Sequence, residues 1–101
     1  MEGKYKVITL CGSTKFKDDF IREQERLTLE GNIVISVGMF SGSEEKVWSS
    51  ETKAMLDDIH KRKIDMADEI FVINKGGYIG ESTKSEIEYA KKTNKKINYM
   101  E

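Results

Sequence analysis

Apolar residues along this chain fall into two patterns, short continuous runs and sets spaced as on a helix. The runs at 5–10, 33–37 and 70–73 predict three strands. The run at 33–37 is apolar except for Ser36, which is typical of a strand buried on both faces of a parallel sheet. Alternation of Ile97 and Tyr99 with polar residues predicts a short last strand, which we expect at an edge.

Helical spacing predicts three helices between these strands. Ser13 is suited to cap the first helix and Gly31 is a natural stop after Glu30. We expect the second helix over 51–67 and the third after the glycines near residue 80. The apolar positions expected on the first two helices are Phe16, Phe20, Ile21 and Leu27, then Met55, Ile59 and Met66.

Regular alternation of strands and helices predicts one α/β domain spanning 1–101, with a parallel sheet and helices on both sides. We expect four strands in the order 2-1-3-4. Ligands of such sheets bind beyond the carboxyl ends of the strands. The loops at that end are 11–13, 38–50 and 75–82, and they hold nearly all the glycines of the chain. This coincidence favours a ligand site there.

Composition narrows the function classes. With 101 residues, 38% of them hydrophobic and 35% charged, the chain has a small core, so we expect a homodimer or larger homo-oligomer. The net charge of -1 argues against a nucleic-acid polymer as partner. A single cysteine fits a reducing cytoplasm, and no apolar stretch or leader indicates a membrane. Cys11 and His60 are far apart in the sequence, so we expect no metal site, and no motif indicates a cofactor.

The segment 67–90 says most about function. It combines a buried strand, a loop with Gly76, Gly77 and Gly80, and a helix with Glu86 about one turn inside its start. Glycines let backbone N–H groups approach a ligand, and the helix dipole favours an ionised carboxylate. These features suit a nucleophile or a sugar-binding anchor. The alternative is that the glycines only form a turn and Glu86 is a solvated helix residue.

Two further loops hold candidate ligand-binding residues. Gly12 and Ser13 follow the first strand, where Ser13 could hold a phosphate or ribose oxygen or simply cap the helix. Trp48, with Met39 and Phe40, lies in a loop otherwise rich in Gly and Ser. These side chains could stack on a nucleobase, contact another subunit or fill the edge of the core.

His60 is the only histidine, and Asp57 precedes it by one helical turn. Near neutral pH a histidine can serve as an acid, a base or a hydrogen-bond donor. Its neighbours Lys61, Arg62 and Lys63 instead favour a plain surface residue.

Three short segments together resemble the nucleoside 2-deoxyribosyltransferase-like superfamily, which includes the 2'-deoxynucleoside 5'-phosphate N-hydrolases. They are Leu10-Cys11-Gly12-Ser13 after the first strand, Ala67-Asp68 before the third, and Glu86-Ile87-Glu88-Tyr89-Ala90 in the last helix. The resemblance implies a flavodoxin-like three-layer sandwich that assembles as a dimer or larger oligomer. It also implies cleavage or transfer at the N-glycosidic bond of a (deoxy)nucleoside or its 5'-monophosphate, with Glu86 as nucleophile.

The chain departs from this family at two positions. Thr9 stands where the hydrolases have a tyrosine, and His60 where they have an aspartate that orients the sugar or assists the leaving base. Asp57 is the alternative for the second role. The expected substrate-binding residues are Gly12, Ser13, Trp48, Gly80 and Ser82. Two other classes stay open. One is a module that binds a nucleotide or nucleotide-sugar without cleaving it, and the other is a protein that only makes subunit contacts.

Overall fold

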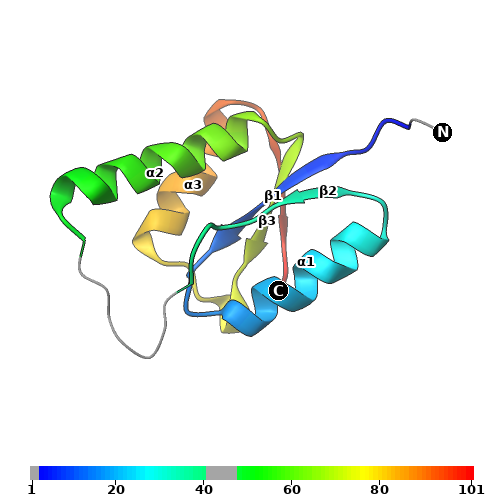
Figure 1. The fold of residues 1–101 in the computed structure, drawn as a ribbon, viewed down its shortest axis with the longest axis horizontal. Helices are drawn as coiled ribbons and strands as arrows, with labels where there is room; N and C mark the ends of the chain where they lie inside the picture. The colour runs from blue at the N-terminus through cyan, green and yellow to red at the C-terminus, as the bar shows by residue number, and fades with distance from the viewer. Residues whose placement is uncertain (1–2, 41–47) are drawn as a thin grey trace.

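The computed structural model describes residues 3–40 and 48–101 of the chain, and Figure 1 shows its fold. The four strands form one parallel sheet in the order β2-β1-β3-β4, which confirms the predicted topology. In chain order the elements are β1 (Val7–Gly12), α1 (Lys17–Leu29), β2 (Ile33–Ile35), α2 (Ser50–Asp65), β3 (Glu69–Ile73), the 3-10 turn η1 (Lys75–Gly77), α3 (Glu81–Lys92) and β4 (Lys96–Tyr99).

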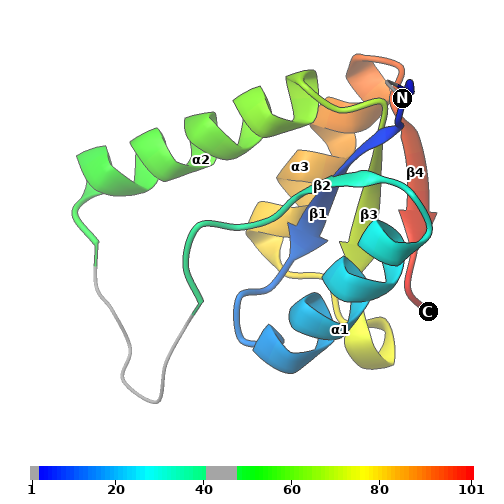
Figure 2. The same cartoon turned by 45° about the vertical axis from the view of Figure 1, so that its right-hand side comes forward.

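Helices cover both faces of the sheet, as the α/β pattern predicts. Figure 2 shows α1 on one face and α2 with α3 on the other. Side chains of β3 pack alternately against the two helical layers, because successive residues of a strand point to opposite faces. Phe71 and Ile73 pack with Phe20 of α1, whereas Ile70 and Val72 pack with residues of the other two helices. The result is a three-layer α/β sandwich compatible with a flavodoxin-like fold.

The second strand is shorter and less buried than its apolar run predicts. It spans Ile33–Ile35, and Ile33 is half exposed. Its position explains this, because β2 pairs only with β1 and lies at the edge of the sheet. The prediction of a strand buried on both faces was therefore wrong here. The expectation that the last strand lies at an edge is confirmed by β4.

The structure confirms the predicted C-terminal end of α1 but not its predicted N-terminal cap. Gly31, with φ +95°, directly follows the C-cap residue Glu30, as expected of a glycine stop. At the other end α1 begins at Lys17 with Phe16 as N-cap, so the prediction that Ser13 caps the helix was wrong. The Ser13 hydroxyl is instead within 3.4 Å of the Lys15 amide, in the turn before the helix.

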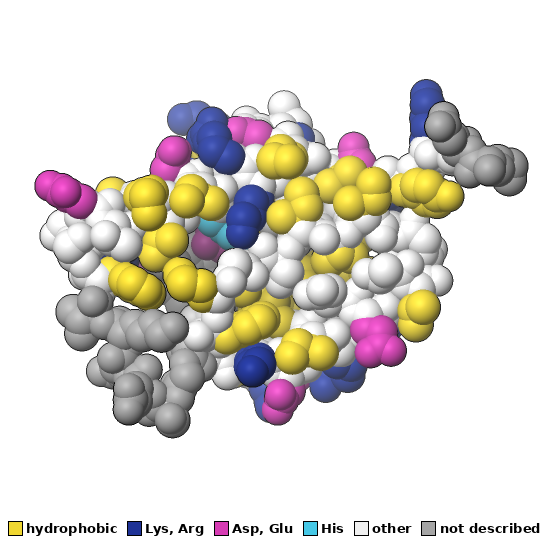
Figure 3. Space-filling view, in the orientation of Figure 1, with side chains coloured by type: hydrophobic (Ala, Val, Ile, Leu, Met, Phe, Trp, Pro, Cys, Tyr) yellow, Lys and Arg dark blue, Asp and Glu magenta, His cyan; other side chains and the backbone are white. Residues whose placement is uncertain are grey.

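The apolar positions predicted for α2 are largely exposed. Met55, Ile59 and Met66 are on the surface, whereas His60 and Ile64 are the buried residues of the helix. For Met55 the position explains this, since the first half of α2 extends beyond the sheet and has no strand beneath it (Figures 1 and 2). Hydrophobic side chains consequently gather on the surface over this helix (Figure 3). None of the helices in the described ranges is long and apolar enough to cross a membrane.

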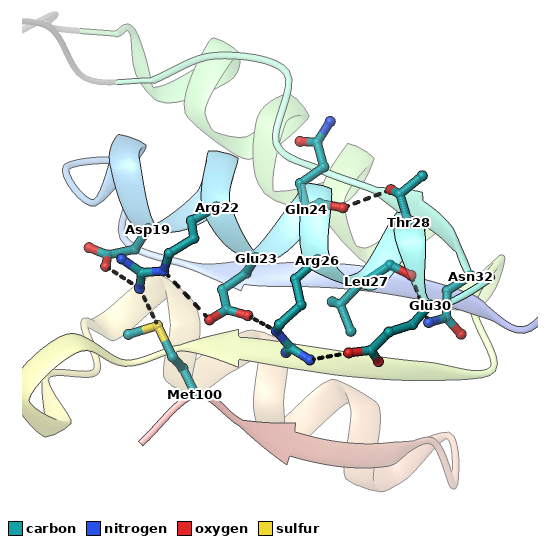
Figure 4. Close-up of polar contacts among 10 residues, drawn as sticks. All are labelled: Asp19, Arg22, Glu23, Gln24, Arg26, Leu27, Thr28, Glu30, Asn32 and Met100. Carbon is teal, nitrogen blue, oxygen red and sulfur yellow. Dashed lines mark hydrogen bonds and ion pairs between the residues drawn. The ribbon is translucent and has the colours of Figure 1, made fainter.

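Helix α1 carries a ladder of ion pairs along its length (Figure 4). Asp19 and Glu23 are buried acidic side chains of this helix. Arg22 Nη2 lies 2.8 Å from Asp19 Oδ1, and Arg26 Nε lies 2.7 Å from Glu23 Oε2. Arg26 also reaches Glu30 at 2.8 Å. Each buried carboxylate of α1 therefore has its own guanidinium partner.

Candidate functional site

A cavity of about 580 Å³ lies at the carboxyl ends of β1 and β3, bounded by the loop after β2 and by α2 and α3. This is the edge at which parallel sheets bind ligands. Of the loop predicted at 38–50, residues 41–47 lie outside the described part of the chain. Every site residue predicted from the sequence lines this cavity: Gly12, Ser13, Trp48, Asp57, His60, Gly80, Ser82 and Glu86.

Gly12 shapes the cavity where β1 ends. Its φ is +149°, and a Cβ added there would lie 2.7 Å from the carbonyl oxygen of Ile73. Any side chain would push apart β1 and β3, which pair up to this point through Gly12 and Ile73. Glycine thus keeps the two strands together to their ends and starts the loop that lines the cavity.

The three glycines after β3 divide into two groups. Gly76 and Gly77 do not line the cavity. The Gly76 amide donates to Glu101 Oε2 at 2.6 Å, and the Gly77 amide donates to the Asn74 carbonyl at 2.7 Å. Both have positive φ, so for these two the turn interpretation holds.

Gly80 is instead the N-cap residue of α3, and as a glycine it has no side chain with which to cap the helix. The first N–H groups of a helix have no partner within it, and Ser82 and Thr83 of this first turn line the cavity. The start of α3 therefore offers backbone donors and the Ser82 hydroxyl to an anionic ligand.

Glu86 lies beyond the first turn of α3, and its side chain is 14% exposed. Among the described residues its buried Oε1 has no hydrogen-bond partner. Burial raises the pKa of Glu86 to about 7, and the negative charge of Asp57 raises it further, while a hydrogen bond from Cys11 opposes the shift. The prediction that the helix dipole keeps this carboxylate ionised was wrong, since the dipole field fades within the first turn and burial dominates.

His60 faces Glu86 from α2, with its Nε2 3.4 Å from Glu86 Oε1. It is buried, so the interpretation as a surface residue was wrong. Burial and the nearby charge of Lys63 lower the pKa of His60 to about 4, against a smaller opposing effect of Asp57. Near pH 7 the histidine is therefore neutral, and it forms no ion pair with Glu86.

Cys11 is the site residue that the sequence analysis missed. Its Sγ lies 3.3 Å from His60 Nε2, and its side chain is fully buried. Burial is the largest cause that raises the pKa of this thiol, followed by the charge of Glu86. Strand alternation gives a usable signal, because Cys11 sits at the end of β1 on the face covered by α2 and α3.

Thr9 does not line the cavity. It is fully buried, and its hydroxyl donates to the Lys63 carbonyl at 2.9 Å. Asp57, in contrast, is an exposed residue of the cavity wall, and its charge acts on both Glu86 and His60. The structure thus offers Asp57 for contact with a ligand.

The three large apolar residues before α2 all line the cavity, and one of them also packs against the core. Trp48 is 44% exposed and lines the cavity. Met39 is also exposed and lines the cavity, so it does not fill the edge of the core. Phe40 is partly buried against the core, with its ring 5.5 Å from that of Phe20. For Phe40 the alternative of a residue that fills the edge of the core is therefore confirmed.

No family model matches this chain, and a comparison with curated proteins finds no match either. The chemistry of the site must then be judged from its own residues. A buried carboxylate with a raised pKa, in a cavity that also offers helix N–H groups, is typical of sites that bind or transform a small polar molecule.

Proposed function

We propose that this protein cleaves or transfers the N-glycosidic bond of a deoxynucleoside or its 5'-monophosphate, with Glu86 as the nucleophile. The observation that supports this most is the Glu86 carboxyl group itself. It lines the cavity, and its buried Oε1 has no hydrogen-bond partner among the described residues. The resemblance around Glu86 to the deoxyribosyltransferase-like proteins supports the same assignment.

The remaining wall of the cavity suits the three parts of a nucleotide. Ser13 and Ser82, with the first N–H groups of α3, can bind phosphate or sugar oxygens. Trp48 can stack on the base, a contact worth about 1–3 kcal/mol. The volume of about 580 Å³ lies within the range of roughly 300–1,000 Å³ usual for small-molecule sites.

In the proposed reaction a Glu86 oxygen attacks C1' while the bond from C1' to the base nitrogen breaks and its electron pair leaves with the base. The departing base takes its proton from water. Neutral His60 can donate a hydrogen bond to the base from its ring N–H, and Asp57 in the cavity wall can orient the sugar or that water. Water, or the nitrogen of a second base, then attacks C1' and releases Glu86. This is the two-step route of retaining glycosidases.

The second candidate is a module that binds a nucleotide or nucleotide-sugar without cleaving it. The pKa of Glu86 near 7 favours it, because close to neutral pH about half of the carboxyl groups are protonated. A protonated carboxyl can donate a hydrogen bond to a sugar hydroxyl but cannot act as a nucleophile.

Chromatography for free base, after incubation with nucleosides and 5'-monophosphates, separates the two candidates. If Glu86 is the nucleophile, kcat rises with pH through about 7 as the carboxyl ionises. A compound that raises the Tm but yields no base at pH 8 would establish the binding module and reject the enzyme. Failure of all these compounds on both tests would reject both candidates.

The proposal includes a homodimer or larger homo-oligomer. Support comes from the apolar side chains exposed along α2, which in a monomer would face water. Ile59, 42% exposed and also in the cavity wall, links this surface to the site. Light scattering at tens of micromolar, roughly where weak interfaces dissociate, tests the assembly, and a monomer would contradict it.

A further inference from the structure

Cys11, His60 and Glu86 come from three separate elements, β1, α2 and α3, and meet beside the cavity. Each offers one ligand atom, and these three atoms all lie within 4.8 Å of one another. Distance along the sequence argued against a metal site, yet the fold brings Cys11 Sγ to 3.3 Å from His60 Nε2. We propose that these residues bind a divalent transition-metal ion, of which zinc fits best.

The spacing of the ligand atoms agrees with a tetrahedral ion. Bonds of about 2.3 Å to sulfur and about 2.0–2.1 Å to nitrogen or oxygen put neighbouring ligand atoms roughly 3.3–3.6 Å apart at tetrahedral angles. The observed separations are 3.3 Å from Cys11 Sγ to His60 Nε2 and 3.4 Å from His60 Nε2 to Glu86 Oε1. The nitrogen–oxygen edge of the ligand triangle therefore already has the length that zinc requires, and the sulfur–nitrogen edge needs to lengthen by only about 0.2–0.3 Å.

An independent observation concerns the same oxygen. Glu86 Oε1 is a buried acceptor without a hydrogen-bond partner among the described residues, and such an atom normally has one. A metal ion held between it and His60 would satisfy this atom. Charge favours the same solution, because a thiolate and a carboxylate neutralise a divalent ion, so the buried cluster has no net charge.

The ligand types select the metal. One sulfur, one imidazole nitrogen and one carboxylate oxygen suit zinc, whereas calcium and magnesium prefer oxygen ligands throughout. Three protein ligands leave the fourth tetrahedral position open. His60 and Glu86 line the cavity, and the fully buried Cys11 does not, so the ion enters from the cavity and its open position faces it.

The metal site is independent of the proposed function, but the two share Glu86. An ion bound through Glu86 occupies the carboxylate that the glycosidic reaction needs. Zinc should therefore block cleavage in a protein that is active after treatment with a chelator. Metal binding is measured without substrate, so its failure would leave the nucleophile proposal untouched.

The test uses full-length protein purified without a histidine tag and stripped with a chelator. Titration calorimetry with zinc should give one ion per chain. The Tm should rise by roughly 10 °C at a zinc concentration about a hundredfold above Kd. Cobalt replaces zinc in a second titration, because a cobalt–thiolate bond gives a charge-transfer band in the near ultraviolet that reports directly on Cys11.

Cys11→Ser and Glu86→Gln should each weaken zinc binding by at least about tenfold, the smallest loss usual for removal of an outer-shell partner. Glu88→Gln is the matched control, since Glu88 is an exposed glutamate on the same helix and is not part of the cluster. It should bind as the wild type does. Circular dichroism verifies that each variant is folded.

Two results would overturn the proposal. The first is a folded wild type that either does not bind cobalt or binds it without a charge-transfer band. The second is unchanged zinc affinity in folded Glu86→Gln, which would assign the binding to other surface groups. If Cys11→Ser does not fold, the cobalt band of the wild type and the Glu86→Gln titration still decide.

Discussion

Both faces of the sheet bury carboxylates, but they treat them differently. On the α1 face, Asp19 and Glu23 each lie within 2.8 Å of an arginine nitrogen. On the α2 and α3 face, Glu86 is also largely buried, yet the basic side chain within 4 Å of it among the described residues is His60, which is neutral near pH 7 and forms no ion pair.

The difference separates structural acids from functional ones. A paired buried carboxylate gains Coulomb energy and hydrogen bonds that offset its lost hydration. Glu86 has no charged partner of opposite sign within ion-pair distance among the described residues, and the hydrogen bond from Cys11 does not offset its burial, so its pKa is raised to about 7. Such a group destabilises the free protein, and contact with a ligand would account for its presence. Sites of this kind are therefore candidates for function. The four predictions below test the contrast, from the largest expected effect to the smallest.

Glu86→Gln should abolish base release while leaving ligand binding largely intact. Glutamine keeps the size of the side chain but cannot form the glycosyl intermediate, so kcat should fall by at least about 10³-fold with little change in the Kd of a nucleotide. Chromatography for free base gives kcat, and calorimetry gives Kd.

The matched control is Glu88→Gln, which removes an exposed glutamate of the same helix. Its kcat should equal that of the wild type. An equal loss in both variants would contradict a special role of Glu86.

The pH dependence of stability should differ between the wild type and Glu86→Gln. Folding raises the pKa of Glu86 from 4.5 to about 7, so its contribution is present below pH 4.5 and is lost as pH rises to about 7. A shift of this size corresponds to about 3 kcal/mol. The free energy of unfolding of the wild type, relative to the variant, should fall by that amount from pH 4.5 to 7.

His60 changes stability in the opposite sense. Folding lowers its pKa from 6.5 to about 4, so its contribution is present above pH 6.5 and is lost as pH falls to about 4. The two effects offset each other between about pH 4.5 and 6.5 in the wild type. Urea unfolding of chelator-treated protein measures both, and parallel curves for wild type and variant would contradict the burial of Glu86 as an acid.

Arg26→Ala should have the opposite profile, a loss of stability without a loss of activity. It removes the guanidinium 2.7 Å from the buried Glu23 Oε2 and leaves Arg22 Nε at 3.9 Å. A buried charged acceptor without its donor costs about 1–3 kcal/mol, so urea unfolding should show a decrease near 2 kcal/mol. The kcat should not change, because α1 covers the face of the sheet opposite α2 and α3 (Figure 2) and contributes no residue to the cavity wall. A loss of activity at unchanged stability would reverse the assignment of the two faces.

The sequence predicted the fold better than the site, for a physical reason. Strand order and layers follow from the alternation of apolar runs and helices, and the structure has them. Glu86 and the cavity loops also follow from local signals, since glycines and a carboxylate after a strand form a recognisable pattern. The contact between Cys11 and His60 does not follow from local signals. These residues are 49 positions apart and meet only because α2 crosses the end of β1.

The smallest effect concerns a single hydroxyl. Ser82 is an exposed residue at the start of α3 and lines the cavity, whereas Ser85 is exposed on the same helix and does not. If Ser82 donates to a 5'-phosphate, Ser82→Ala should raise KM for the monophosphate by about tenfold, the cost of one hydrogen bond to a charged group, because the helix N–H groups remain. KM for the nucleoside, which has no phosphate, should change much less, and Ser85→Ala should alter neither. Equal effects of Ser82→Ala on the nucleoside and the monophosphate would place the phosphate elsewhere in the cavity and leave Ser13 as the hydroxyl to test.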